Sequence, residues 1–146
     1  MDRADLDKIS YLVIQSAVEI HKALGPGLLE SVYRTCMIYE LRARALTVSS
    51  EVSIPVRYKD LVLDGFYRLD LVINDAVVVE LKAVENVHPV HRAQVLSYLR
   101  LTDRQLGLLI NFHVDRLVMG VDRIVNKFGW ADSDGCPSAE IPTDKP

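Results

Sequence analysis

The stretch that decides the fold runs from Arg68 to Val84 and reads Arg-Leu-Asp-Leu-Val-Ile-Asn-Asp-Ala-Val-Val-Val-Glu-Leu-Lys-Ala-Val. Two mostly apolar, β-branched runs flank an Asn-Asp turn signal, which is the pattern of a hairpin of two buried strands. Three charged side chains interrupt this pattern: Asp70 in the first strand, and Glu80 and Lys82 in the second. An ionised group in a buried strand is costly unless it is paired or holds a metal. The hairpin therefore predicts a polar site on these two strands.

The register of the hairpin decides whether the three charges meet. Residues two apart in a strand share a face, so Glu80 and Lys82 are neighbours. If Ile73 faces Val77 across a three-residue connection, Asp70 faces Glu80. A two-residue turn would instead send the two carboxylates to opposite faces of the sheet, unless a bulge intervened. We predict the first register.

Two carboxylates and a Lys on one face fit a site for a hard cation. Mg²⁺ prefers one or two carboxylates, completed by waters and by phosphate oxygens of a substrate, and Mn²⁺ would serve as a substitute. The Lys would orient or deprotonate a water, or stabilise the charge that builds up in a phosphoryl-transfer transition state. The same residues also fit a half-exposed edge hairpin with an ordinary Glu and Lys side by side, because short motifs often match by chance.

The residues also carry a resemblance to a known family. An Asp in one strand and Glu-x-Lys in the next resemble the signature of the PD-(D/E)xK nuclease superfamily, although Leu69 stands in place of the Pro of that name. Residues 27–33, Gly-Leu-Leu-Glu-Ser-Val-Tyr, resemble the pattern that names the GxxExxY protein family, a branch of that superfamily. The similarity covers nearly everything from Ile20 to Val125 and includes Gly65–Asp70, Val79–Val84, Gln94 with Tyr98, and Leu108–Phe112.

This resemblance implies a restriction-endonuclease-like fold and a Mg²⁺-dependent nuclease that hydrolyses phosphodiester bonds in nucleic acid, and we expect DNA rather than RNA as the substrate. Asp70 and Glu80 would be the metal ligands, with Glu30 as a third acid, and the carbonyl of Leu81 could add a ligand. Lys82 would position the attacking water or stabilise the developing charge. The oligomeric state stays open, with a homodimer or a larger assembly among the options.

The spacing of three between Gly27, Glu30 and Tyr33 places these residues along one face of a helix. Read alone, Glu30 is a residue that favours the helix N-terminus and Tyr33 is a core side chain. The resemblance instead makes Glu30 a site residue, and Tyr33 would orient it by a hydroxyl hydrogen bond or buttress its helix. His21 lies one turn before the break at 25–27 and is either a site-supporting group or a satisfied core histidine.

Gln94 and Tyr98 lie four residues apart on one side of a predicted helix. An amide and a phenol so aligned can hold a phosphate or a nucleotide edge, or fix the metal site from behind. Gln-x-x-x-Tyr after Glu-x-Lys resembles the extra motif of RecB-type nucleases. The alternative is a helix that packs its apolar residues on the sheet and leaves Gln94 solvated.

The order of elements predicts an α/β domain with a central mixed sheet flanked by helices, ααβββαββ. Pro55 indicates an edge strand or a bulge. A helix followed by a continuously apolar strand implies a parallel crossover connection. The predicted helices cover 5–24, 28–44 and 91–102, and the predicted strands cover 51–58, 61–73, 76–84, 105–112 and 115–121.

Length and composition place the chain among ordinary globular proteins. Its 146 residues, 49% hydrophobic and 25% charged, predict one nuclease-like domain over 1–128 and a polar, disordered tail over 129–146. No run is long and apolar enough for a membrane span, and the acidic N-terminus is unlike a signal peptide, so we expect a cytoplasmic protein without membrane contact. The two cysteines lack metal-ligand spacing, which argues against a zinc site or a disulfide framework.

Charge neither supports nor excludes nucleic acid as the partner. The net charge is −3, and residues 129–146 contribute four acids against one Lys, also −3, which leaves 1–128 neutral. The absence of a basic stripe argues against tight binding through extended phosphate contacts. Two rivals to a nuclease are a non-catalytic module that binds nucleic acid or protein through the same fold, and a structural protein with an internal salt-bridge network. Mn²⁺ titration would separate them, since a salt-bridge network excludes the ion.

Overall fold

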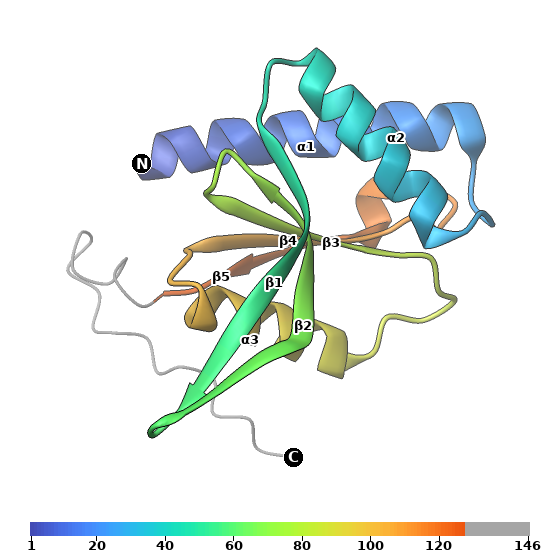
Figure 1. Ribbon diagram of the computed structural model, residues 1–146. Coiled ribbons are helices and arrows are strands. Elements are labelled where there is room, and N and C mark those ends of the chain that lie inside the picture. The colour runs from blue at the N-terminus through green and yellow to red at the C-terminus, as the bar shows by residue number, and fades with distance from the viewer. Residues whose placement is uncertain (128–146) are drawn as a thin grey trace.

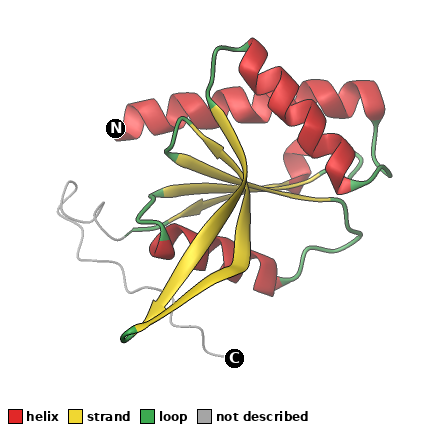
Figure 2. Ribbon diagram, viewed as in Figure 1, coloured by secondary structure: helices red, strands yellow, loops and turns green. Residues whose placement is uncertain are grey.

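A computed structural model describes residues 1–127 and contains a five-stranded mixed sheet with helices on both faces (Figures 1 and 2). The strand order follows the chain, β1-β2-β3-β4-β5. This confirms the predicted α/β class; the tail predicted over 129–146 lies outside the described residues. The elements are α1 (Arg3–Leu24), α2 (Glu30–Ala43), β1 (Val48–Tyr58), β2 (Leu61–Ile73), β3 (Val77–Lys82), α3 (Pro89–Leu101), β4 (Leu106–Asn111), the 3₁₀ turn η1 (Leu117–Gly120) and β5 (Val121–Val125).

The sheet separates two apolar cores, which is why its central strands read as continuous apolar runs. α1 and α2 pack on one face, against alternate strand residues such as Leu71, Val79 and Leu108. α3 packs Val95 and Leu99 on the other face. β3 and β4 are therefore covered on both sides, as parallel strands usually are.

The β2–β3 hairpin has the predicted register. Ile73 pairs with Val77 and Leu71 with Val79, across a connection in which the amide of Ala76 donates to the carbonyl of Ile73 at 3.0 Å. Asn74 in the turn has a φ of 50° and accepts a 2.8 Å hydrogen bond from the amide of Thr47. β3 and β4 pair in parallel through α3, which confirms the predicted crossover.

The predicted position of the last strand was wrong. We expected a strand over 115–121, but Leu117–Gly120 form a 3₁₀ turn and the strand follows at Val121–Val125. At Gly120 the chain passes so close to the carbonyl of Asn111 that a side chain there would clash with it. The apolar residues before Gly120 therefore belong to the turn, and pairing with β4 begins only at Val121.

β1 and β2 run beyond the body of the sheet as a two-stranded ribbon, which we call the β1–β2 arm (residues 53–68; Figure 1). Pro55 lies opposite a bulge of three residues, because Ile54 pairs with Tyr67 but Val56 pairs with Leu63. Within this bulge Gly65 has a φ of 80°, which glycine tolerates better than other residues. β1 is also the edge strand, so both structures that Pro55 indicated are present.

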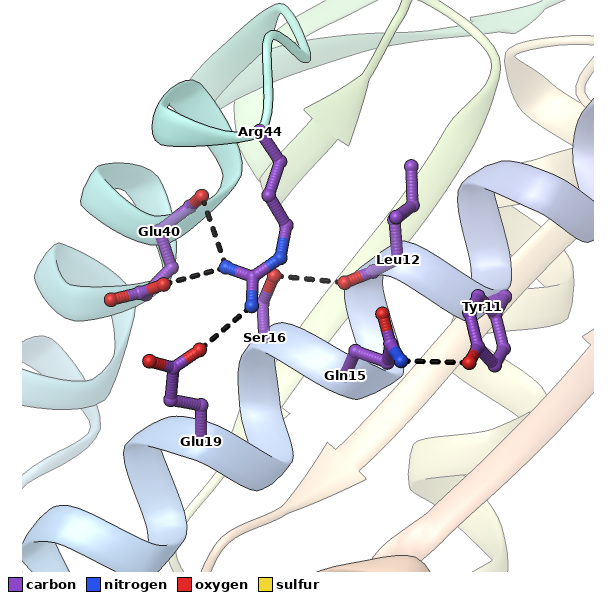
Figure 3. Close-up of polar contacts among 7 residues, drawn as sticks. All are labelled: Tyr11, Leu12, Gln15, Ser16, Glu19, Glu40 and Arg44. Atoms are coloured by element: carbon purple, nitrogen blue, oxygen red, sulfur yellow. Dashed lines mark hydrogen bonds and ion pairs between the residues drawn. The ribbon is translucent and has the colours of Figure 1, made fainter.

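An ion-pair bridge joins the two helices that cover the first face (Figure 3). The guanidinium of Arg44 lies 2.7 Å from the carboxylate of Glu19 on α1 and 2.6 Å from that of Glu40 on α2. The hydrogen bonds that Arg44 donates to Glu19 and Glu40 raise its pKa above the ordinary value. The bridge thus fixes the α1–α2 layer above the sheet.

Over residues 1–127, no helix is long and apolar enough to cross a membrane.

Candidate active site

Asp70 and Glu80 meet where the ladder between β2 and β3 ends. The last ladder pair is Leu71 with Val79. Beyond it, the amide of Asp70 donates to Glu80 Oε1 at 3.0 Å, and the amide of Leu81 donates to Asp70 Oδ2 at 2.9 Å. Each carboxylate therefore satisfies a backbone amide of the opposite strand, and these two bonds hold both acids in place.

On its other side, Asp70 faces an irregularity in β1. The pairs Ser50 with Leu71 and Val52 with Leu69 put Glu51 opposite Asp70, and Glu51 has a φ of 51°. Side chains other than Gly rarely adopt this left-handed conformation. Leu71 faces the α1–α2 core, whereas Leu69, two residues earlier on the same strand, faces the α3 core. The side chains of β2 therefore change face between these two residues, and Asp70 is the residue between them.

The carboxylate pair is short of positive charge. Burial, and then the charge of Asp70, raise the pKa of Glu80 to about 8. The hydrogen bond from the amide of Asp70 and the charge of Lys82 act in the opposite direction but are outweighed. Without a bound cation, Glu80 therefore carries a proton at neutral pH. A cation at this site would take the place of that proton.

Lys82 adds an uncommitted ammonium group beside the acids. It ends β3 two residues after Glu80 and is partly buried. Its charge lowers the pKa of both Glu80 and His91, so it lies within electrostatic range of both. Among the residues that the structure describes, it has no hydrogen-bond or ion-pair partner. The ammonium is thus available to a ligand.

α3 brings Tyr98 to the same place. Burial raises the pKa of Tyr98, and the charge of Glu80 is the next cause. The ring of Tyr98 lies 6.0 Å from that of Tyr67 on β2. Gln94, one turn earlier on α3, is exposed. The structure therefore places Tyr98 beside the acids, with Gln94 at the rim.

Glu30 does not join the carboxylate pair. Within residues 1–127, no three His, Cys, Asp or Glu side chains are grouped closely enough to hold one metal ion. Glu30 is the first residue of α2 and is half-buried; its charge only partly offsets the burial and the charge of Lys82 that lower the pKa of His91. The structure thus shows two acids together, with Glu30 separate from them.

Tyr33 buttresses its helix and does not orient Glu30. Its hydroxyl donates to the carbonyl of Gly25 at 2.6 Å and accepts from the amide of Leu28 at 3.2 Å. Its buried ring stacks on Phe112 at a centroid distance of 4.2 Å. Because the single hydroxyl proton is used by Gly25, the predicted hydrogen bond to Glu30 is not formed.

His21 is a satisfied core histidine. It is buried, its Nε2 lies at hydrogen-bond distance, 2.8 Å, from the carbonyl of Val114, and its ring lies 6.4 Å from that of Phe112. The loop that contains Val114 is thereby tied to the end of α1. The structure favours the core interpretation of His21 over the site-supporting one.

His91 is a site neighbour that the sequence interpretation missed. The amide of His88 donates to His91 Nδ1 at 3.2 Å, at the start of α3. Burial, followed by the charge of Lys82, lowers the pKa of His91. The available signal was its spacing, because residues 91, 94 and 98 follow steps of three and four along one helix face.

The comparison with protein families agrees with this geometry. A profile described as the PD-(D/E)XK nuclease superfamily matches residues 7–124. No curated protein and no solved structure matches the chain. The matched region contains the whole sheet up to β5 and all the acids described above. The chain belongs to the PD-(D/E)XK nuclease superfamily, and its mixed sheet with flanking helices is a restriction-endonuclease-like fold.

Proposed function

We propose that this protein is a metal-dependent nuclease that hydrolyses phosphodiester bonds in nucleic acid, and we expect DNA rather than RNA to be the substrate. The observation that carries the proposal is the reciprocal bonding of Asp70 and Glu80 across the end of the β2–β3 ladder, next to an unpaired Lys82. A buried Glu80 and a half-buried Asp70 in this arrangement, in a chain of a nuclease superfamily, are well suited to bind a cation at a phosphate.

We further propose that the chain belongs to the GxxExxY branch. Three motif residues have separate roles at the turn into α2, which supports this assignment. Gly27 has a φ of 100°, Glu30 begins the helix, and the hydroxyl of Tyr33 closes the turn onto Gly25. A motif whose members each perform a structural task is less readily explained by chance than a bare sequence match.

The donor set fits a divalent cation such as Mg²⁺. Asp70 and Glu80 provide carboxylate oxygens, and Mg²⁺ is commonly held by one or two carboxylates, with waters and substrate oxygens completing the shell. Burial and the charge of Asp70 raise the pKa of Glu80, and a cation bound between the two acids would favour its charged form instead. Bound there, a divalent ion would polarise the scissile phosphate and make water more acidic.

The chain's own side chains divide the remaining work. The ammonium of Lys82 would hold the attacking water or stabilise negative charge on the phosphate. Tyr98 lies beside the acids and Gln94 lies one turn away, so these two would contact a phosphate or a base edge. Glu30, in the first turn of α2, would act from outside the carboxylate pair, near enough to His91 for its charge to act on that ring.

Cleavage assays test this proposal directly. Labelled single- and double-stranded DNA and RNA are incubated with the protein and Mg²⁺ or Mn²⁺, with EDTA as the negative control. We expect cleavage that falls by about 100-fold or more in Asp70→Asn and Lys82→Ala. Glu19→Gln, on the opposite helix layer, is the matched charge control and should cleave normally. Cleavage that persists in both site variants would contradict the proposal, and ion binding without any cleavage would favour a non-catalytic binding module.

A further inference from the structure

The β1–β2 arm carries a stripe of aromatic and apolar side chains on one face. Directly paired residues share a face, so the pairs Ile54 with Tyr67 and Tyr58 with Leu61 lie on the same side of the ribbon. Ile54 is buried against the α3 core, whereas Tyr67, Tyr58 and Leu61 are exposed to 46%, 62% and 55%. The stripe therefore leaves the core at Ile54 and becomes more exposed toward the tip.

The arm also carries cations that no acid neutralises. Arg57, Lys59 and Arg68 are exposed and, within residues 1–127, pair with no carboxylate. Lys59 Nζ lies 5.3 Å from the ring centroid of Tyr58 at the tip. By contrast, Asp64 is used within the arm, where it accepts from Ser53 Oγ at 3.1 Å and from the amide of Gly65 at 2.9 Å. Lys59 therefore places a positive charge beside the aromatic stripe, whereas Arg57 and Arg68 lie on the other face of the ribbon.

The stripe leads to the carboxylate pair. Tyr67 lies three residues before Asp70 on β2, and its ring is 6.0 Å from that of Tyr98. The charges of Glu80 and Asp70 both act on Tyr98. Tyr67 on the arm and Tyr98 on α3 thus connect the exposed arm with the two acids.

We propose that the β1–β2 arm binds a single strand of nucleic acid and guides it to Asp70 and Glu80. This inference rests on the proposed function and deepens it by naming the form of the substrate. Aromatic rings stack on any unpaired base, and a few cations suffice to hold a flexible backbone. A duplex hides its bases from such stacking, and three cations are few for following its backbone.

Fluorescence anisotropy with a labelled oligothymidylate of about 20 nucleotides, in EDTA so that no cleavage occurs, tests the arm alone. We expect Tyr58→Ala to weaken binding about 10-fold, because one stacking platform is lost. Tyr39→Ala is the matched control: Tyr39 is 73% exposed on α2, away from the arm, and its loss should leave the affinity unchanged. Circular dichroism and thermal unfolding verify that both variants fold.

Salt dependence tests the cations separately. For a single strand, each phosphate contact contributes about −0.7 to the slope of log affinity against log salt. Lys59→Gln should reduce that slope by about 0.7, whereas Lys8→Gln, an exposed α1 control, should not. A slope unaffected by Lys59→Gln would overturn the role given to the tip.

The outcomes separate this inference from the proposed function. Hydrolysis of bis(p-nitrophenyl) phosphate by the wild-type protein with Mn²⁺ reports on the carboxylate site with a diester too small to need the arm. Hydrolysis without strand binding would overturn the inference that the arm binds a single strand, but it would support the proposed nuclease function. Strand binding without hydrolysis would support the inference about the arm and contradict the proposed nuclease function. Equal affinity of wild type and Tyr58→Ala, tighter binding of a duplex, or a homodimer that Tyr58→Ala dissociates would each overturn the inference.

Discussion

The two halves of β2 have opposite environments within one strand. The inner half, Leu69–Ile73, pairs with β1 on one side and β3 on the other over its last three residues, and it is largely buried. The outer half, residues 61–68, pairs only with β1 and is mostly exposed. Asp70 lies at the junction.

This difference explains why the site forms where it does. A strand that loses its partner leaves backbone amides without ladder bonds. At the junction, the amide of Asp70 donates to the carboxylate of Glu80, and the amide of Leu81 donates to the carboxylate of Asp70. The acids are thus held where the pairing between β2 and β3 ends. Because β3 does not continue alongside the outer half of β2, that half is available to form the arm.

The largest expected effect separates Asp70 from an acid at the tip of the arm. Asp70→Ala should lower hydrolysis of bis(p-nitrophenyl) phosphate by about 100-fold or more, because a metal ligand is removed. Asp60→Ala, in the exposed turn between β1 and β2, should leave this hydrolysis unchanged. Initial rates in Mn²⁺ measure both. Equal losses in the two variants would place the chemistry outside the junction.

The second effect compares leucines in the two halves of β2. Leu71 is fully buried, so Leu71→Ala should lower the free energy of unfolding by about 2–5 kcal/mol. Leu61 is 55% exposed, and Leu61→Ala should change it by no more than about 0.5 kcal/mol. Urea unfolding gives both values. Similar losses would show that the arm packs against part of the protein in solution.

The third effect is the pH dependence of stability caused by Glu80. Its pKa rises from 4.5 to about 8 on folding, so the folded state binds the proton more tightly than the unfolded state. The resulting stabilisation is fully present below pH 4.5 and is lost as the pH rises through about 8. Urea unfolding without metal should show this decline. In Glu80→Gln that part of the decline should be absent; an unchanged pH profile would rule out Glu80 as its source.

The smallest effect tests the bulge in the outer half of β2. Gly65 has a φ of 80°, and open space surrounds it, so Gly65→Ala adds backbone strain without a steric clash. We expect a loss of about 1–2 kcal/mol in the free energy of unfolding. Ser53→Ala, which removes an exposed hydrogen bond to Asp64, is the control for the bulge's polar contact. A loss as large as that for Leu71→Ala would contradict a loosely coupled arm.

Local patterns were sufficient to predict the inner hairpin and the crossover. The parity of the Asn74–Ala76 connection fixed which residues oppose each other, and the apolar run after α3 indicated a strand covered on both faces. The same parity predicts that Asp70 opposes Glu80, and their reciprocal hydrogen bonds to the opposite strand agree with it. Pairing rules of this kind depend only on residues close in sequence or directly opposed.

Contacts between distant segments could not be predicted in this way. His21 is satisfied by Val114, and the hydroxyl of Tyr33 is used by the turn that precedes it; neither partner is marked in the sequence. The arm could not be predicted either, because the alternation of apolar and polar residues in 52–58 predicts a strand but does not show whether a helix covers it. His91 was overlooked because it stood at the predicted start of its helix, where a residue's direction is least certain.

Calorimetric titration of Mn²⁺ into the metal-free protein at neutral pH tests the central claim most directly. The account predicts one site on the wild-type protein, with release of about one proton from Glu80, seen as a dependence of the heat on the buffer's ionisation enthalpy. In the Asp70→Asn, Glu80→Gln double variant, both the binding and the proton release should disappear. Mn²⁺ binding that survives in the double variant, or a folded wild-type protein that binds no Mn²⁺, would contradict the account.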